Sequence, residues 1–365
     1  MPLDIYSTVH MENLIREKPT VYSWMKDRYF SASPDTSVFK TKKVIVDYDD
    51  GAGNLMAPFV IPRVGKVPML REGFETREIE PAYIAPSRPL SIDDMEKRMA
   101  GENIVSKLTP EQRERVYLMD DLDYLDKAIT RREEWMCAQT MLDNACTMSH
   151  IGDKADKAVD LVARYYTGNS NPGVFVKSAV WAIGTATQRG TWYDDVAAQA
   201  ADLAEKGRPV TDLVVGSEVS EMILSDPWVH AMLDNRRENW GEIDPRWAEN
   251  GVIRIGTLNF SGIPLTIFCY RGSYQTRNAN GTLSTGYYFP SKGAMLAAPA
   301  TGKILYGAVT QVEMDNKTHT RAGTRVPKHN VNVDSNQKET ILTAKPIAVP
   351  LMKGMWRSCR DVLTT

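Results

Sequence analysis

The strongest hydrophobic pattern in the chain runs from Thr109 to about Met148, a stretch with no glycine and no proline after Pro110. Apolar residues recur there at every third or fourth position, which is the spacing of one face of an α-helix. Thr109, Pro110 and Gln112 supply a Thr-x-x-Gln capping box with proline at the first helical position. We therefore predict a helix over 109–148 whose apolar face is a core element, made of Leu118, Leu122, Leu125, Ile129, Trp135 and Met136.

The region 42–91 has an extended pattern that proline interrupts. Val44, Val46 and Tyr48 alternate with polar residues, which is the period of a β-strand. Six prolines follow between positions 58 and 89, and each fixes its own φ and moves the preceding residue toward extended conformations. We expect such a ribbon to contribute little to the subunit's own core and to bury its apolar groups against something else. Residues 1–41 mix short apolar clusters with polar residues, and we predict a terminal arm there.

After Gly152 the pattern becomes that of a compact α/β unit. We predict helices over 154–166 and 194–207, the second ending at Gly207. The segment 209–217 is predicted as a strand that leads into a helix with Ser217 as its N-cap.

The remaining patterns are mainly those of strands. The segments 252–260 and 263–271 are predicted to form a hairpin through Ser261 and Gly262. Two strand-rich segments, 303–314 and 338–352, close the chain, and a polar loop lies between them.

Composition and charge are those of a soluble protein with a core. Hydrophobic residues make up 42% and charged residues 25% of 365 residues, and the net charge is −2. Such a charge provides no bulk attraction for nucleic acid. No apolar run is long enough for a signal peptide or a membrane span. Four scattered cysteines without a CxxC pair indicate reduced, buried thiols.

The sequence offers little catalytic chemistry. The five histidines are isolated, and no HExxH, GxSxG or Walker motif is present. The Asp47, Asp49 and Asp50 cluster lacks the ligand spacing of an EF-hand. Paired acids such as Glu133 and Glu134 are predicted to lie on solvated helix faces. We therefore predict a protein that is not an enzyme and that has no cofactor and no metal site.

A resemblance to a known family covers nearly the whole chain. It is carried by the ribbon, by "RREEWMCAQTML" in the predicted long helix, by "PVTDLVVGSEVSEMILSDPWVHAML", and by "GTLSTGYYFPSKGAMLAAPATGKILYGAV" with the closing "KETILTAKPIAVPLMKG". In order and spacing these segments resemble the major head protein of lambda-like tailed phages.

The resemblance implies the α+β fold of tailed-phage capsid proteins, which is shared with encapsulins and the herpesvirus capsid floor. It divides the chain into an N-terminal arm (1–41), an extended hairpin called the E-loop (42–91), a P-domain with the long helix (92–152), an A-domain (153–298) and closing P-domain strands (299–365). It further implies hexamers and pentamers that form an icosahedral shell around DNA in the virion, after assembly in the host cytoplasm. The implied partners are other copies of the chain, a scaffold, a portal and a decoration protein, with weak or no specific contact to the DNA.

On this reading the ribbon docks on a neighbouring subunit, and its prolines reduce the entropy lost on docking. The predicted interface residues are Val44, Val46, Tyr48, Phe59, Ile61, Tyr83, Ile84, Pro86 and Arg88. Two alternatives share part of this evidence. One is the shell protein of a cellular nanocompartment, which would enclose a cargo enzyme, and the other is an enzyme whose site lies in the α/β unit.

Overall fold

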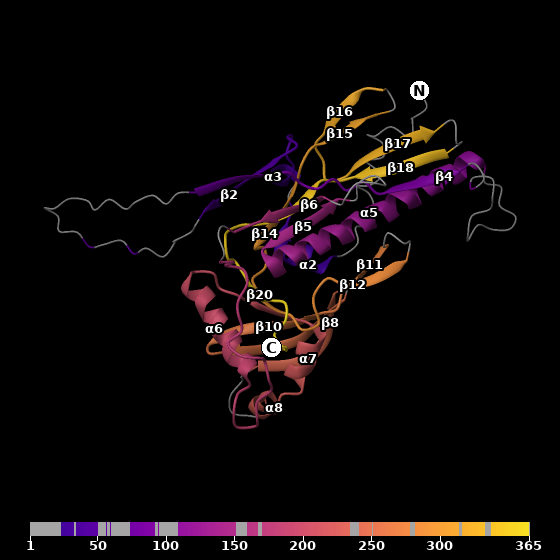
Figure 1. Ribbon diagram of the computed structural model, residues 1–365. Coiled ribbons are helices and arrows are strands. Elements are labelled where there is room, and N and C mark those ends of the chain that lie inside the picture. Colours follow the sequence, from indigo (N-terminus) through magenta and orange to yellow (C-terminus); the bar gives the residue numbers. More distant parts are fainter. Residues whose placement is uncertain are drawn as a thin grey trace.

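Figure 1 shows the computed structural model, which describes residues 23–32, 34–49, 56, 59, 74–91, 94, 109–150, 159–166, 170–233, 241–249, 251–277, 282–313, 316–332 and 337–364. A long helix crosses a group of small sheets in the upper half of the view. A six-stranded sheet with its helices forms the lower half.

The long helix α5 spans Pro110–Asp143 and begins as predicted. The amide of Gln112 donates to Thr109 Oγ1 over 3.3 Å, and the amide of Thr109 donates to Gln112 Oε1 over 3.0 Å, which completes the capping box. The helix ends before the predicted Met148. Asn144 adopts the left-handed conformation with φ 51°, and the chain continues as strand β5 (Ala145–His150).

The first core surrounds the second half of α5. It is built by helix α2 (Trp24–Tyr29), the sheet β1–β14–β19 (Phe30–Ser31, Gly302–Tyr306, Pro346–Pro350) and the hairpin of β5 with β6 (Val159–Arg164). The short helix α3 (Pro34–Ser37) follows β1. The largest fully buried side chains of the first core are Met25, Tyr29, Tyr48, Met141, Tyr165 and Trp356.

The ribbon begins as the antiparallel hairpin of β2 (Val44–Asp49) and β3 (Phe74–Ile79). The alternation predicted for β2 is confirmed, because Val44, Val46 and Tyr48 are buried while Ile45 and Asp47 are exposed. The buried side chains belong to the first core. The expectation that the ribbon contributes little to the subunit's own core is therefore wrong for this strand.

The first half of α5 is covered by a three-stranded sheet in the order β17–β18–β4 (Val326–Asn332, Gln337–Thr343, Ser87–Ser91). Leu342 and Ala344 pack with Leu125 and Ile129 of the helix, and Ile84 packs against this cluster. A separate hairpin of β15 and β16 (Val309–Val312, Thr318–Arg321) lies above this sheet in the view of Figure 1.

The second core lies between the six-stranded sheet and its helices. The strand order is β20–β13–β7–β10–β9–β8 (Arg357–Cys359, Ala294–Ala297, Asp212–Val215, Ile263–Tyr270, Val252–Phe260, Gly241–Glu249). The accompanying helices are α6, α7 and α8 (Thr191–Glu205, Ser217–Leu224, Pro227–Leu233). Between β10 and β13 the chain forms a two-stranded hairpin, β11 and β12 (Ser273–Arg277, Leu283–Tyr287).

Two local predictions in this unit are confirmed. Strands β9 and β10 form the expected hairpin, and its turn residues Ser261 and Gly262 both have positive φ, 50° and 96°. Gly207 follows α6 with φ 70°, and its amide donates to the carbonyl of Ala204 over 2.9 Å.

Three other predictions are wrong. The helix predicted over 154–166 is wrong for its described part, because 159–164 is strand β6, whose pairing with β5 outweighs the local pattern, and 154–158 lie outside the described residues. Ser217 is the first helical residue of α7, and Gly216 is its N-cap. The chain end was assigned to the closing strands, yet β20 pairs with β13 and Val362 is buried in the second core.

Candidate functional site

The described residues contain no group of three His, Cys, Asp or Glu side chains placed to hold a metal ion. His230 Nε2 lies 2.8 Å from the carbonyl oxygen of Leu224, so this histidine is used locally. Burial raises the pKa of Cys137, and it raises that of Cys146 to about 12, which makes both thiols poor nucleophiles. In the part of the chain that the structure describes, no helix is both long and apolar enough to span a membrane.

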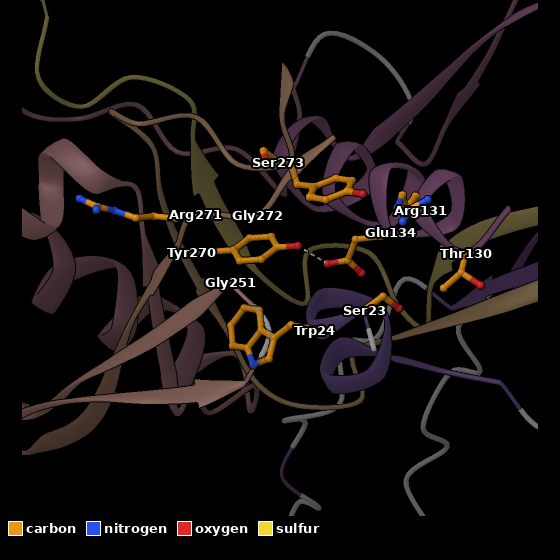
Figure 2. Close-up of a pocket in the computed structure, with 11 residues that line it drawn as sticks. Ser23, Trp24, Thr130, Arg131, Glu134, Gly251, Tyr270, Arg271, Gly272 and Ser273 are labelled. Atoms are coloured by element: carbon orange, nitrogen blue, oxygen red, sulfur yellow. Dashed lines mark hydrogen bonds between the residues drawn. The ribbon is translucent and has the colours of Figure 1, made fainter. Parts of the chain in front are cut away.

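A pocket of about 310 Å³ lies where α2, α5, β10 and the β11–β12 hairpin meet (Figure 2). Trp24, Tyr270 and Tyr288 supply aromatic walls, and Ser23, Ser273 and Arg131 supply polar groups. At its base Tyr270 donates its hydroxyl to Glu134 Oε1 over 2.6 Å. The pocket therefore lies against the first core, beside the start of the described chain.

Glu134 fixes the beginning of α2 on the long helix. Its carboxylate accepts the amides of Met25 and Lys26 over 2.9 and 2.8 Å, in addition to the Tyr270 hydroxyl. Burial raises the pKa of Glu134, and these three donors act in the opposite direction without cancelling the effect of burial. A buried carboxylate with three donors is a specific tether between elements that are far apart in sequence.

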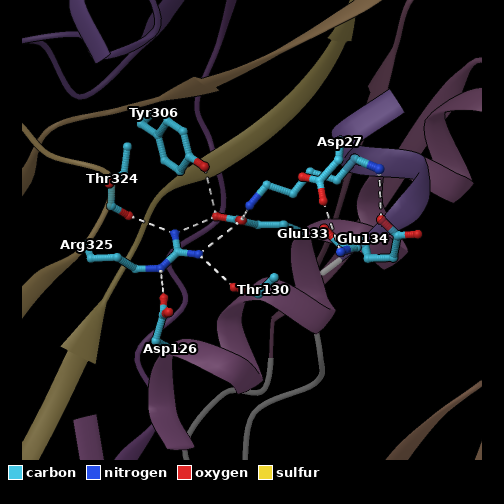
Figure 3. A network of polar contacts seen from close by, with 10 residues as sticks. Asp27, Asp126, Thr130, Glu133, Glu134, Tyr306, Thr324 and Arg325 are labelled. Atoms are coloured by element: carbon cyan, nitrogen blue, oxygen red, sulfur yellow. Dashed lines mark hydrogen bonds and ion pairs between the residues drawn. The ribbon is translucent and has the colours of Figure 1, made fainter. Parts of the chain in front are cut away.

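The neighbouring Glu133 joins three segments of the chain (Figure 3). Lys26 Nζ lies 2.6 Å from its Oε2, and Arg325 Nη1 and Nη2 lie 2.6 and 3.1 Å from its two oxygens. Tyr306 donates its hydroxyl to the same carboxylate over 3.1 Å. Burial alone would raise the pKa of Glu133, but the two cations outweigh it and lower the pKa to about 2.

Arg325 makes further hydrogen bonds to side chains of α5. Its Nε donates to Asp126 Oδ1 over 2.7 Å, and its Nη2 donates to Thr130 Oγ1 over 3.2 Å. The prediction that Glu133 and Glu134 form a solvated pair is therefore wrong. Their partners lie more than a hundred positions away in sequence, so the local pattern of the helix carries no signal for them.

The structure places the predicted core residues of the long helix inside the subunit. Leu118, Leu122, Leu125, Ile129 and Met136 are buried. Trp135 is half-buried against the first core, with the Arg132 guanidinium 5.2 Å from the centre of its ring.

The predicted interface residues separate into three groups. Val44, Val46 and Tyr48 are buried in the subunit's own core, so the prediction that they contact a neighbour is wrong. Tyr83, Phe59 and Arg88 are exposed, and Ile84 and Pro86 are half-buried. Ile61 lies outside the described residues.

The end of the ribbon packs against its own subunit. Strand β4 pairs with β18, and the amide of Ile84 donates to the carbonyl of Ala344 over 2.9 Å. Arg88 pairs with Asp121 of α5 over 2.9 Å, and its guanidinium lies 4.5 Å from the ring centre of Tyr124. Pro89 is accommodated because β4 is an edge strand.

Several large apolar side chains are exposed that the sequence analysis did not identify. Val116, Met119 and Tyr124 lie along α5, and Leu283 and Tyr287 lie on β12. The alternation in "LSTGY" is a signal that could have identified the last two as one face of a strand.

Comparisons with known proteins agree with this fold. The family model for phage major capsid protein E matches residues 7–358. The major capsid protein of Enterobacteria phage phi80 is 24% identical over 321 residues, which cover 86% of this chain and 87% of that protein. A structure from E. coli CFT073, assigned as a prophage capsid protein, is similar with a TM-score of 0.57 and 15% identity, covering 97% of this chain and 98% of that one. The chain therefore belongs to the phage major capsid protein E family, has the α+β fold of tailed-phage capsid proteins, and is a structural protein of the phage head shell and not an enzyme.

Proposed function

We propose that copies of this chain associate as hexamers and pentamers, and that these close into an icosahedral shell around the phage DNA. The observation that carries the proposal is the set of large apolar side chains exposed on separate elements of the subunit. They include Ile45 on β2, Val116 and Tyr124 on α5, and Leu283 and Tyr287 on β12. Exposed apolar groups on several sides favour a subunit that has like neighbours on several sides.

The connection between β2 and β3 is proposed to be the E-loop that reaches a neighbour. Phe59 and Met56, the described residues of this connection, are both highly exposed. An aromatic and a flexible thioether side chain are typical anchors at protein interfaces. Tyr83 and Arg88 are exposed and are proposed to contribute to the same interface. Ile84 and Pro86, which are half-buried, are proposed to lie at its edge.

The proposed domain roles follow the two cores. The first core with α5 forms the P-domain, and the six-stranded sheet with α6, α7 and α8 forms the A-domain. The chain end from β20 onward is assigned to the A-domain because its strand and Val362 lie in the second core.

Other partners of the proposed shell are a scaffold during assembly in the host cytoplasm, a portal and a decoration protein. Packaged DNA is proposed to make weak contact with the inner surface. The net charge of −2 supports this, because strong binding of phosphates requires a surplus of lysine and arginine.

The test is electron microscopy of particles that form when the chain is produced with its natural scaffold. Closed shells built of six- and five-membered rings are expected. Particles isolated from infected cells should contain phage DNA, whereas an enclosed enzyme without DNA would indicate a cellular nanocompartment. A chain that stays monomeric under all assembly conditions would contradict the proposal.

A further inference from the structure

We propose that the outer face of the β11–β12 hairpin is the surface on which the next copy of the chain docks with the outer face of its β2–β3 hairpin. The inference rests on the proposed shell and names two elements that meet within one of its rings.

The β11–β12 hairpin has one supported face and one free face. Its register places Ser273 opposite Tyr287 and Gln275 opposite Thr285, and all four residues are exposed. On the other face Tyr274 lies across Gly286, where a Cβ atom would come within 2.6 Å of its ring. The Tyr274 ring contacts that of Tyr288 in a tilted arrangement, with 5.1 Å between the ring centres. Among the described residues of the hairpin, those on the inner face pack against the subunit.

Two large apolar side chains stand on the free face among polar ones. Leu283 is 64% exposed and Tyr287 is 67% exposed, and they lie on the same side of β12. An isolated pair of strands is marginally stable in water, and a covering surface would stabilise it. These two side chains are therefore suited to contact with another protein surface.

The two hairpins lie on opposite sides of the subunit. In Figure 1 β2 extends to one side of the molecule, and β11 and β12 lie on the other. In a ring of identical subunits every contact joins one side of a subunit to the other side of the next. The β2–β3 side of one copy therefore faces the β11–β12 side of its neighbour.

The chemistry of the two faces is complementary. On the outer face of β2, Ile45 is 50% exposed, and Asp47 lies two residues further along. Asp47 accepts the Thr76 hydroxyl over 2.6 Å and has no cationic partner among the described residues. Residues 271–287 contain two arginines and no acid. Within the described chain, the exposed Arg271 side chain has no carboxylate partner. Apolar groups can thus meet apolar groups while Asp47 pairs with Arg271.

The first experiment compares shell yield among variants of the full chain. Leu283→Ser combined with Tyr287→Ser should lower the yield of closed shells by roughly tenfold or more, because two central anchors are lost. Val331→Ser, an exposed valine on β17, is the matched control and should retain wild-type yield. Circular dichroism and a melting curve establish that each variant is folded.

The second experiment does not depend on the folding of the serine variant. Asp47→Arg should reduce shell yield, and addition of Arg271→Asp should restore it. In assembled shells Ile45→Cys with Leu283→Cys should form disulfides between copies under an added oxidant, which give a ladder of up to six chains on a non-reducing gel. If the serine variant forms closed shells in wild-type yield, this inference is wrong while the proposed function stands. The same holds if intact shells show neither charge rescue nor cross-linking. Failure of the wild-type chain to form shells would overturn the proposed function, and this inference with it.

Discussion

Arg325 and Glu133 form a buried bidentate ion pair, with 2.6 Å between Nη1 and Oε1 and 3.1 Å between Nη2 and Oε2. Lys26 approaches the same carboxylate from α2. One side chain of the long helix therefore holds the start of the described chain and the segment that enters β17. Strand β1, which follows α2, and strand β17 belong to different sheets of the described chain, so the network supplies a specific geometry that apolar packing alone does not.

Glu133→Gln should lower the free energy of unfolding by about 3 kcal/mol, because it leaves the buried Arg325 charge without its main partner. The loss is expected at the lower end of the range for broken buried pairs, since Arg325 keeps Asp126 and Lys26 is partly exposed. Urea unfolding measures it. Asp120→Asn, an exposed change on the same helix, is the control and should alter stability by less than about 0.5 kcal/mol. Equal stability of the two variants would show that the pair is not a stabilising contact.

Glu133 and Glu134 should give opposite pH dependences. The pKa of Glu133 is about 2 in the fold against an ordinary 4.5, so its stabilising contribution is complete above pH 4.5 and is lost as the pH falls toward 2. The pKa of Glu134 is raised, so its ionised form is unfavourable in the fold, and this cost disappears as the pH falls through the raised pKa toward 4.5.

The measurement is unfolding free energy against pH for each glutamine variant and the wild type. The destabilisation caused by Glu133→Gln should shrink below pH 4.5. The destabilisation caused by Glu134→Gln should grow as the pH falls toward 4.5, because only the wild type gains from protonation. Parallel curves for the two variants would contradict the assignment.

The sequence predicts those features that depend on residues close together in the chain. The capping box at Thr109, the alternation in β2 and the turn at Gly262 are local, and the structure has all three. The end of α5 was missed because asparagine is a less frequent left-handed cap than glycine. Strand β6 was missed because its partner β5 decides its conformation.

The functional surfaces were harder to predict for a related reason. Glu133 and Glu134 follow the pattern of a solvated helix face, and only their distant partners reveal that they are buried. Val44 and Tyr48 are apolar, and the sequence does not show whether they face their own core or a neighbour. The local pattern of a strand is the same in both cases.

Leu122→Ala and Leu125→Ala should each destabilise the subunit by about 2 to 5 kcal/mol, because both side chains are fully buried on α5. Trp135→Ala should cost less than a fully buried tryptophan would, since this side chain is half-buried. Val116→Ala on the exposed face is the control and should change the melting temperature little. A leucine variant that melts like the control would place its side chain outside the core.

Two excisions separate the part of the ribbon that folds the subunit from the part proposed to reach a neighbour. Removal of residues 44–91 should prevent folding, because it deletes Val44, Val46 and Tyr48 from the first core and β4 from its sheet. Replacement of residues 51–72 by a short Gly/Ser linker keeps β2 and β3, so a soluble subunit with a cooperative melt is expected. That subunit should fail to form closed shells, because the connection with Phe59 is lost from the interface. Circular dichroism and electron microscopy read out the two effects. Normal shells from the shorter excision would show that this connection does not clamp neighbours, and a folded subunit after the longer one would show that the first core does not need the ribbon.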